Sequence, residues 1–69
     1  MWTFKQEKDK QVWTMKDSCY NEITLKPENS KFLLIRTINN IKVYEKKFSD
    51  EQSALQFITK LKYHLLQKY

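Results

Sequence analysis

The chain has 69 residues, of which 41% are hydrophobic and 30% charged, and its formal net charge is +5. This composition excludes a disordered segment, and the length predicts one domain at the small end of those that fold alone. The longest apolar run covers residues 32–35, far fewer than the ~18 of a membrane-spanning helix, and no signal peptide is recognisable, so we expect a cytoplasmic protein of microbial or viral origin.

The sequence offers little support for catalysis. The single Cys19 excludes an internal disulfide, and the single His64 leaves no cluster of metal ligands. A catalytic centre needs a nucleophile beside a base, paired carboxylates or a metal, and no such pattern is recognisable. A phosphate-binding glycine loop is excluded because the chain contains no glycine. We therefore expect no enzyme, no cofactor and no metal.

Two segments near the N-terminus alternate apolar and polar residues and predict half-buried strands, at residues 2–7 and 13–17. We expect them to form a hairpin within residues 1–17. A four-residue loop at positions 8–11 would pair Phe4 with Met15 and Gln6 with Trp13. That register gathers four large side chains on one face: Trp2, Phe4, Trp13 and Met15.

Residues 22–48 predict a three-stranded meander. After a turn at residues 18–21, its first strand covers residues 22–26 and stops at Pro27, and residues 27–30 have turn composition. Strands at residues 31–38 and 41–48 then meet across the Asn39-Asn40 turn. Without glycine, left-handed backbone must come from asparagine, which tolerates positive φ better than other residues: Asn29, Asn39 and Asn40.

Regular pairing across this turn, with Ile38 opposite Ile41 and Arg36 opposite Val43, assigns both faces of the hairpin. One face holds Phe32, Leu34, Arg36, Ile38, Ile41, Val43, Glu45 and Lys47. The other holds Lys31, Leu33, Ile35, Thr37, Lys42, Tyr44, Lys46 and Phe48. Both faces carry large apolar groups, so we expect both to be covered. A helix can cover one, and the N-terminal hairpin, a second copy or a partner must cover the other.

Residues 49–69 predict an amphipathic helix. Ser49 is a suitable N-cap, and Asp50 and Glu51 complement the positive end of the helix dipole. At the helical period, one apolar stripe forms, with two leucines along its edge: Ala54, Phe57, Ile58, Leu61 and Leu65, with Leu55 and Leu66. The expected fold is α+β, a single domain over residues 1–69 in which an antiparallel meander of four to five strands packs against one C-terminal helix.

Three features of the sequence resemble those of a known protein family. They are the order of strands, the Asn-Asn turn and the junction from a basic strand to the helix. At the junction, Phe48 and Ser49 match the family pattern, and Ala54 comes one place later than usual. Over residues 23–61 the chain resembles the arm-type DNA-binding domain of phage and transposon tyrosine recombinases, which lays the exposed face of a three-stranded sheet in the DNA major groove. The chain departs from that family in its extra N-terminal hairpin and its glycine-free turns.

The resemblance implies DNA rather than RNA as the partner. It also implies which strand residues bind, with two lysines nearby for phosphates: Arg36, Lys42, Tyr44, Lys46 and Lys47, with Lys26 and Lys31.

Two other interpretations remain open. Trp13, Trp2, Phe4 and Tyr44 could stack on the bases of a single strand, and strands followed by one helix also resemble the positive-cofactor-four coactivators, which dimerise through that helix and bind single strands. In a different class, a protein-interaction module such as a phage- or plasmid-encoded inhibitor would dock an apolar sheet face on a host protein. We expect a small non-catalytic nucleic-acid-binding protein, with the interaction module as the alternative.

Overall fold

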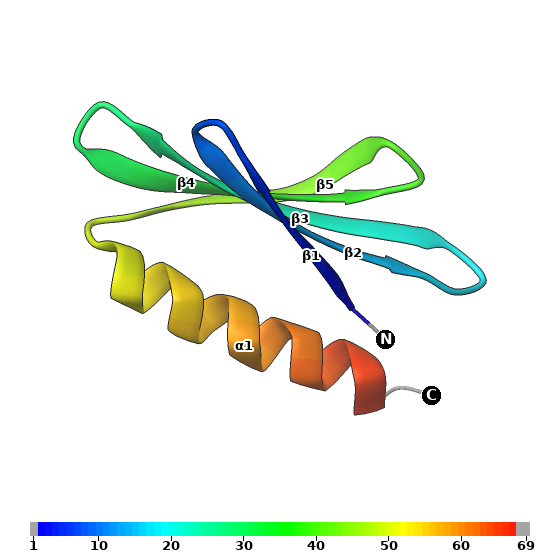
Figure 1. Cartoon of the computed structure of the whole chain (residues 1–69). Coiled ribbons are helices and arrows are strands. Elements are labelled where there is room, and N and C mark those ends of the chain that lie inside the picture. Colours follow the sequence, from blue (N-terminus) through cyan, green and yellow to red (C-terminus); the bar gives the residue numbers. More distant parts are fainter. Residues whose placement is uncertain (1, 68–69) are drawn as a thin grey trace.

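The computed structural model describes the backbone of residues 2–67 and the side chains of residues 2–64. Its elements are β1 (Thr3–Glu7), β2 (Lys10–Lys16), β3 (Tyr20–Glu28), β4 (Lys31–Ile38), β5 (Ile41–Phe48) and α1 (Glu51–Gln67). The strands form one antiparallel sheet in chain order, and α1 lies along one face of it (Figure 1). The expected α+β meander with a C-terminal helix is thus confirmed. We call the face against α1 the helix side and the other the open face.

The N-terminal hairpin extends the sheet instead of covering it. Its turn is two residues long, at positions 8–9, so Phe4 pairs with Trp13. The predicted four-residue loop, which pairs Phe4 with Met15 and Gln6 with Trp13, is therefore wrong. Because the two registers differ by an even number of residues, the same apolar side chains still share one face, the helix side. As β1 is an edge strand, the hairpin leaves the open face uncovered.

Both later hairpin turns use left-handed backbone. The φ angles are 50° at Asn29, 67° at Ser30, 53° at Asn39 and 68° at Asn40, which confirms the role predicted for the asparagines and adds Ser30. Asn39 also anchors its turn to the start of β3. Its N–H donates to the Tyr20 carbonyl at 2.8 Å, and the Tyr20 N–H donates to Asn39 Oδ1 at 2.9 Å.

The third strand is longer than the sequence predicts at both ends. It already begins at Tyr20, so the predicted turn at residues 18–21 is too long, and it continues through Pro27 to Glu28. Pro27 lies opposite Phe32, next to the closing pair of a two-residue hairpin, where backbone groups point away from the paired strand. On that other side, pairing with β2 ends two residues earlier, so the missing N–H interrupts no ladder.

A β-bulge in β5 changes which of its side chains face the helix. Pairing from the β4–β5 turn proceeds as predicted up to Thr37 with Lys42, but the next pair is Arg36 with Tyr44, which leaves Val43 as an extra residue. The predicted pairing of Arg36 with Val43 is wrong. A shift of one residue exchanges the faces of all the β5 residues that follow.

Beyond the bulge, Tyr44, Lys46 and Phe48 lie on the helix side, while Glu45 and Lys47 lie on the open face. The exchange stabilises the fold because Phe48 packs against the core, and full burial of a phenylalanine side chain contributes roughly 1.5–3 kcal/mol to the free energy of unfolding. Without the bulge, a glutamate and a lysine would point toward α1 and the aromatic rings would point into water, at a cost in desolvation.

The hydrophobic core lies between α1 and the helix side of the sheet. In α1, Ala54 and Ile58 are 0% and 1% exposed, which confirms the centre of the predicted stripe, and Phe57 packs against them. The sheet contributes four buried residues: Trp13, Ile23, Leu25 and Leu34. The predicted stripe continues to Leu65 and Leu66, and the predicted helix to Tyr69, but these side chains and residues 68–69 lie outside the described part.

No segment of residues 2–67 lies over the open face (Figure 1). Even so, Val12 and Leu33 on this face are only 5% and 4% exposed. Leu33 lies between Lys26 and Lys47 across the strands, and the aliphatic stems of such long side chains cover apolar neighbours. None of the described helices is long and apolar enough to cross a membrane.

Asp50, not the predicted Ser49, is the N-cap of α1. The Ser53 N–H donates to Asp50 Oδ1 at 3.0 Å, and α1 begins one residue later at Glu51. Hydrogen bonds from the Ser53 side chain and backbone lower the pKa of Asp50 below its ordinary value. The charged form of Asp50 therefore stabilises the folded state.

The two residues of the β4–β5 turn should respond differently to glycine. Both Asn39→Gly and Asn40→Gly relieve a positive φ, so Asn40→Gly should leave the free energy of unfolding unchanged or raise it by about 0.5 kcal/mol. Asn39→Gly also removes the acceptor of the Tyr20 N–H, so this variant should lower the free energy of unfolding by about 1 kcal/mol. Urea denaturation of both variants measures the difference, and equal effects would contradict the anchoring role of Asn39.

The stability conferred by Asp50 should depend on pH. Since its folded-state pKa is lowered, the contribution is complete above the unfolded pKa and is lost as pH falls through the folded pKa. The stability difference between wild type and Asp50→Asn, which caps without titrating, should therefore stay constant from neutral pH down to the ordinary pKa of an aspartate and shrink below it. Ser49→Ala serves as the control, because a constant offset from wild type at every pH is expected there. The roles of Ser49 and Asp50 would be reversed if Ser49→Ala showed the pH-dependent difference.

Candidate nucleic-acid interface

The side chains predicted to contact nucleic acid divide between the two faces of the sheet. Four lie on the open face: Lys26, Lys31, Lys42 and Lys47. The other four lie on the helix side: Arg36, Tyr44, Lys46 and Trp13. Alternation along the strands already divides the predicted set between the two faces, and the bulge in addition moves Tyr44 and Lys46 to the face opposite Lys42, so the set does not form one continuous face. It does bring the β5 members together at an exposed sheet edge, which is accessible from both sides.

Trp13 is a core residue in this fold. It is 8% exposed and lies beneath α1, with the Phe4 ring centroid 5.2 Å from its own and Lys62 Nζ 5.6 Å from its ring. Little of the indole surface is therefore free to stack on a base. Phe4, which was also predicted to stack on bases, is 51% exposed. It lies on β1, at the opposite edge of the sheet from β5.

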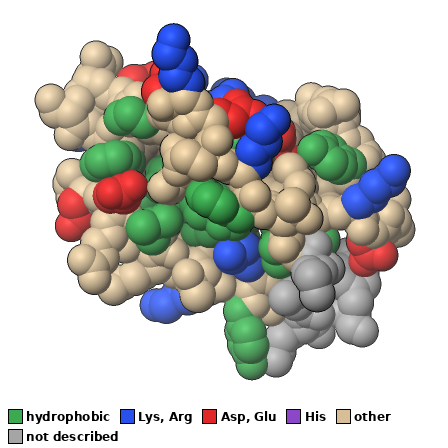
Figure 2. Space-filling view, in the orientation of Figure 1, with side chains coloured by type: hydrophobic (Ala, Val, Ile, Leu, Met, Phe, Trp, Pro, Cys, Tyr) green, Lys and Arg blue, Asp and Glu red, His purple; other side chains and the backbone are tan. Residues whose placement is uncertain are grey.

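The open face carries charges of both signs. Every carboxylate borne by a strand lies on it: Glu7, Glu22, Glu28 and Glu45. The strand lysines on it are Lys5, Lys10, Lys16, Lys26, Lys31, Lys42 and Lys47. Figure 2 shows acidic and basic side chains next to one another in the part of the molecule above α1. This face is therefore a mosaic with only a partial excess of positive charge.

Ion pairs occupy several lysines of the open face. The pairs join Lys5 and Lys10 to Glu7, Lys42 to Glu45, and Lys47 to Glu28, at N–O distances of 2.7–3.7 Å. The shortest is a hydrogen bond from Lys42 Nζ to Glu45, and together with the lysine charge it lowers the pKa of Glu45 below its ordinary value. Lys42 and Lys47, both predicted to bind nucleic acid, thus have carboxylate partners within the chain.

No ion pair among the described residues includes a cation of the helix side. No strand presents a carboxylate on this side, and residues 52–64 of α1 contain none. Where β5 meets α1, positive and aromatic side chains gather on one surface, which we call the β5–α1 surface: Arg36, Tyr44, Lys46, Phe57 and Lys60. Positive charge is uncompensated there, in contrast to the open face.

Three aromatic rings build a rigid platform on the β5–α1 surface. The Tyr44 and Phe57 rings are parallel within 12°, with centroids 6.1 Å apart, and Phe48 packs on Phe57 at 5.4 Å. Lys46 Nζ lies 5.2 Å from the Phe57 centroid and 5.3 Å from that of Phe48. Tyr44 remains 40% exposed. The platform therefore offers an aromatic ring to solvent, with a cation held beside it.

Arg36 lies next to this platform with a donor that has no acceptor. It is the cross-strand neighbour of Tyr44, and its Nε is buried without a hydrogen-bond partner among the described residues. None of the ion pairs found in the described part includes it. A buried unsatisfied donor is rare in folded proteins and lowers stability. Because Nε itself is buried, a ligand could contact Arg36 only through the other donors of its guanidinium group.

Phe57 and Lys60 are not among the binding residues predicted from the sequence. Phe57 was assigned to the buried stripe of the helix, yet it supports Tyr44 and borders a shallow depression with Lys60, Leu61 and His64. A signal was present in the sequence, since residues 52–64 contain basic side chains without any carboxylate. This signal identifies a binding surface only when the strand beside the helix is known. The structure shows that this strand is β5.

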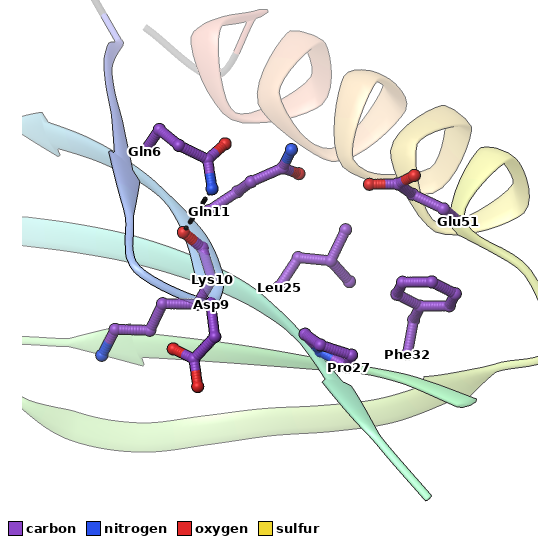
Figure 3. A pocket seen from close by; sticks show the side chains of 8 residues that line it. All are labelled: Gln6, Asp9, Lys10, Gln11, Leu25, Pro27, Phe32 and Glu51. Carbon is purple, nitrogen blue, oxygen red and sulfur yellow. Dashed lines mark hydrogen bonds between the residues drawn. The ribbon is translucent and has the colours of Figure 1, made fainter. Parts of the chain in front are cut away.

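A second depression lies between the β1–β2 turn and the start of α1 (Figure 3). It is lined by Gln6, Asp9, Lys10, Gln11, Leu25, Pro27, Phe32 and Glu51. Gln6 Nε2 donates to the Lys10 carbonyl at 3.2 Å, while Gln11 Oε1 is buried without a partner. The lining places no nucleophile beside a base. Within the described chain, no group of three or more metal-ligating side chains is close enough to hold a metal ion.

Comparison with known proteins gives no match: no family model fits the chain, and neither a curated protein nor a solved structure is significantly similar to it. The resemblance to arm-type domains therefore stays a prediction. The features of the chain that bear on function are the geometry and charge of the β5–α1 surface.

Replacement of Arg36 by an apolar residue should not weaken the fold. Arg36→Met keeps the aliphatic stem and removes the unsatisfied donor, so the free energy of unfolding should stay unchanged or rise by about 1 kcal/mol. Leu34→Ala, at a fully buried position of the same strand, should lower it by about 2–5 kcal/mol. Chemical denaturation of both variants checks this, and a loss above 1 kcal/mol in Arg36→Met would show that the guanidinium stabilises the fold.

Proposed function

We propose that this protein is a small, non-catalytic nucleic-acid-binding protein that uses the β5–α1 surface. The observation that carries the proposal is the combination of an exposed tyrosine with cations that have no carboxylate partner: Arg36 and Lys46 flank Tyr44, and Lys60 follows on α1. Nucleic acids present anionic phosphates and aromatic bases, so a surface with both complementary features suits them.

The β5 edge enlarges this surface. Lys42 and Lys47 belong to the same exposed strand as Tyr44 and Lys46 but point to the open face. Their ion pairs are solvent-exposed, and exposed pairs typically contribute only ~0–1 kcal/mol, so a phosphate can replace a carboxylate at low cost. Lys26 and Lys31 lie farther from the edge, on β3 and at the start of β4, and would add phosphate contacts for a longer ligand.

DNA is the expected nucleic acid, because the resemblance of residues 23–61 to arm-type domains points to it. The net charge of +5 favours polyanions in general and does not distinguish DNA from RNA. The proposed role needs no catalytic group, cofactor or metal.

A second candidate is a protein-interaction module that binds through the β5 edge. Seven of the eight residues of β5 are exposed, and Ile41 and Val43 are 67% and 49% exposed. Such an edge can accept an additional strand from a partner or from a second copy of the chain. The sequence suggested docking through an apolar sheet face, and the uncovered face is less apolar than expected because the bulge moves Tyr44 and Phe48 away from it.

Binding to DNA should be salt-dependent and should require the β5–α1 cations. In fluorescence anisotropy titrations with a labelled DNA oligonucleotide, affinity should fall steeply between about 50 and 200 mM salt. The double variant Arg36→Ala, Lys46→Ala should weaken binding about tenfold or more at low salt and reduce the salt slope by about two.

The matched control removes the same charge from the far edge of the sheet, in Lys5→Ala, Lys10→Ala, and should lose much less affinity. Equal losses in the two double variants would mean that net charge alone, not the β5–α1 surface, drives binding. If wild type does not bind even at low salt, the nucleic-acid function is excluded and strand addition at β5 becomes the better candidate.

A further inference from the structure

We infer that the β5–α1 surface takes a single strand, with an unpaired base stacked on Tyr44. This inference rests on the proposed nucleic-acid function and adds to it the strand state and the contacting group. Its starting point is the orientation of one exposed ring, together with the width of the sheet behind it.

Tyr44 is a partly exposed ring on which an unpaired base can stack. The phenol ring is within 12° of parallel to Phe57, with centroids 6.1 Å apart, and the side chain stays 40% exposed. In a duplex, each base is stacked between its neighbours and presents only its edges in the grooves. A single strand presents the faces of its bases, which is how aromatic platforms bind it.

The cations around the ring fit a backbone that runs along β5. Lys46 lies two residues from Tyr44 on the same side of the strand, about 7 Å along it, and is held over Phe57 at 5.2 Å. Arg36 lies on the other flank of Tyr44, on the neighbouring strand. Arg36 is half-buried, and its guanidinium group carries further donors besides the buried Nε that can bind a phosphate.

The shape of the sheet disfavours the alternative of a duplex read through the open face. The major groove of B-DNA is about 12 Å wide. The sheet has five strands in a row, and at ~4.8 Å between neighbours it spans about 19 Å. A three-stranded sheet would span about 10 Å and fit the groove. The N-terminal hairpin, which adds β1 and β2 in the same layer, makes this sheet too wide.

The test compares three labelled ligands of equal length with the full-length chain by fluorescence anisotropy at low salt. The ligands are a thymidine oligonucleotide, the same deoxyribose-phosphate backbone carrying abasic sites in place of bases, and a duplex. The wild-type protein should bind the thymidine oligonucleotide about tenfold more tightly than the abasic strand, since each stacked base contributes substantially. It should also prefer that oligonucleotide over the duplex.

Two variants assign the stacking to one ring. Tyr44→Ile keeps a residue suited to a strand and an apolar contact with Phe57, but it offers no ring face; it should lose about tenfold in affinity for the thymidine oligonucleotide and little for the abasic strand. Tyr44→Phe, which keeps the ring, should bind like wild type. Circular dichroism of each variant verifies that the fold is retained.

The outcomes separate this inference from the proposed function. Equal affinity for the thymidine and abasic strands, or tighter binding of the duplex, overturns the stacking inference and leaves nucleic-acid binding in place. Equal loss for both strands in Tyr44→Ile overturns it as well, because Tyr44 then acts without the base. If none of the three ligands binds at low salt, the proposed function fails and the inference fails with it.

Discussion

The bulge at Val43 is the constraint on which the rest of this molecule depends. Because side chains alternate along a strand, one extra residue decides which half of β5 faces α1. With the bulge, Phe48 closes the core against Phe57, and Tyr44 stacks on the same ring. Without it, the core would lose both contacts and would have to accommodate a glutamate and a lysine. The burial of aromatic rings therefore favours the observed register.

The same register separates the charges of the protein. All strand carboxylates lie on the open face, where three of the four pair with lysines, and no ion pair among the described residues includes Arg36 or Lys46 on the helix side. Exposed ion pairs contribute little to stability, so the pairing has more effect on the electrostatic field than on the fold. It weakens the field above the open face and leaves the surface beside α1 positive. A net charge of +5 is thus unevenly distributed, and the uneven distribution indicates where an anion would bind.

Much of the fold could be predicted from the sequence because the signals were local. The apolar stripe around Ala54 and Ile58 fixed the buried side of the helix, and the lack of glycine pointed to Asn39 and Asn40 as turn residues. The bulge could not be predicted, because it follows from the contact of β5 with a helix that comes later in the chain. The complete set of binding residues could not be predicted for the same reason. Tyr44 and Arg36 were predicted from their residue types, but Phe57 joins them only through the contact between β5 and α1. Trp13 was chosen on the same basis and lies in the core.

Arg36 illustrates how a small domain can retain a residue that does not help it fold. A chain of 69 residues has little stability to spare, and a buried donor without an acceptor lowers it further. Two other buried polar atoms under α1 are also unsatisfied, Trp2 Nε1 and Gln11 Oε1, but they are neutral. Arg36 alone among the three combines a positive charge with an exposed aromatic neighbour. No strand presents a carboxylate on this side, so an anionic ligand could pair with the other donors of the guanidinium group, and a half-buried arginine that lowers stability is explained by such a contact.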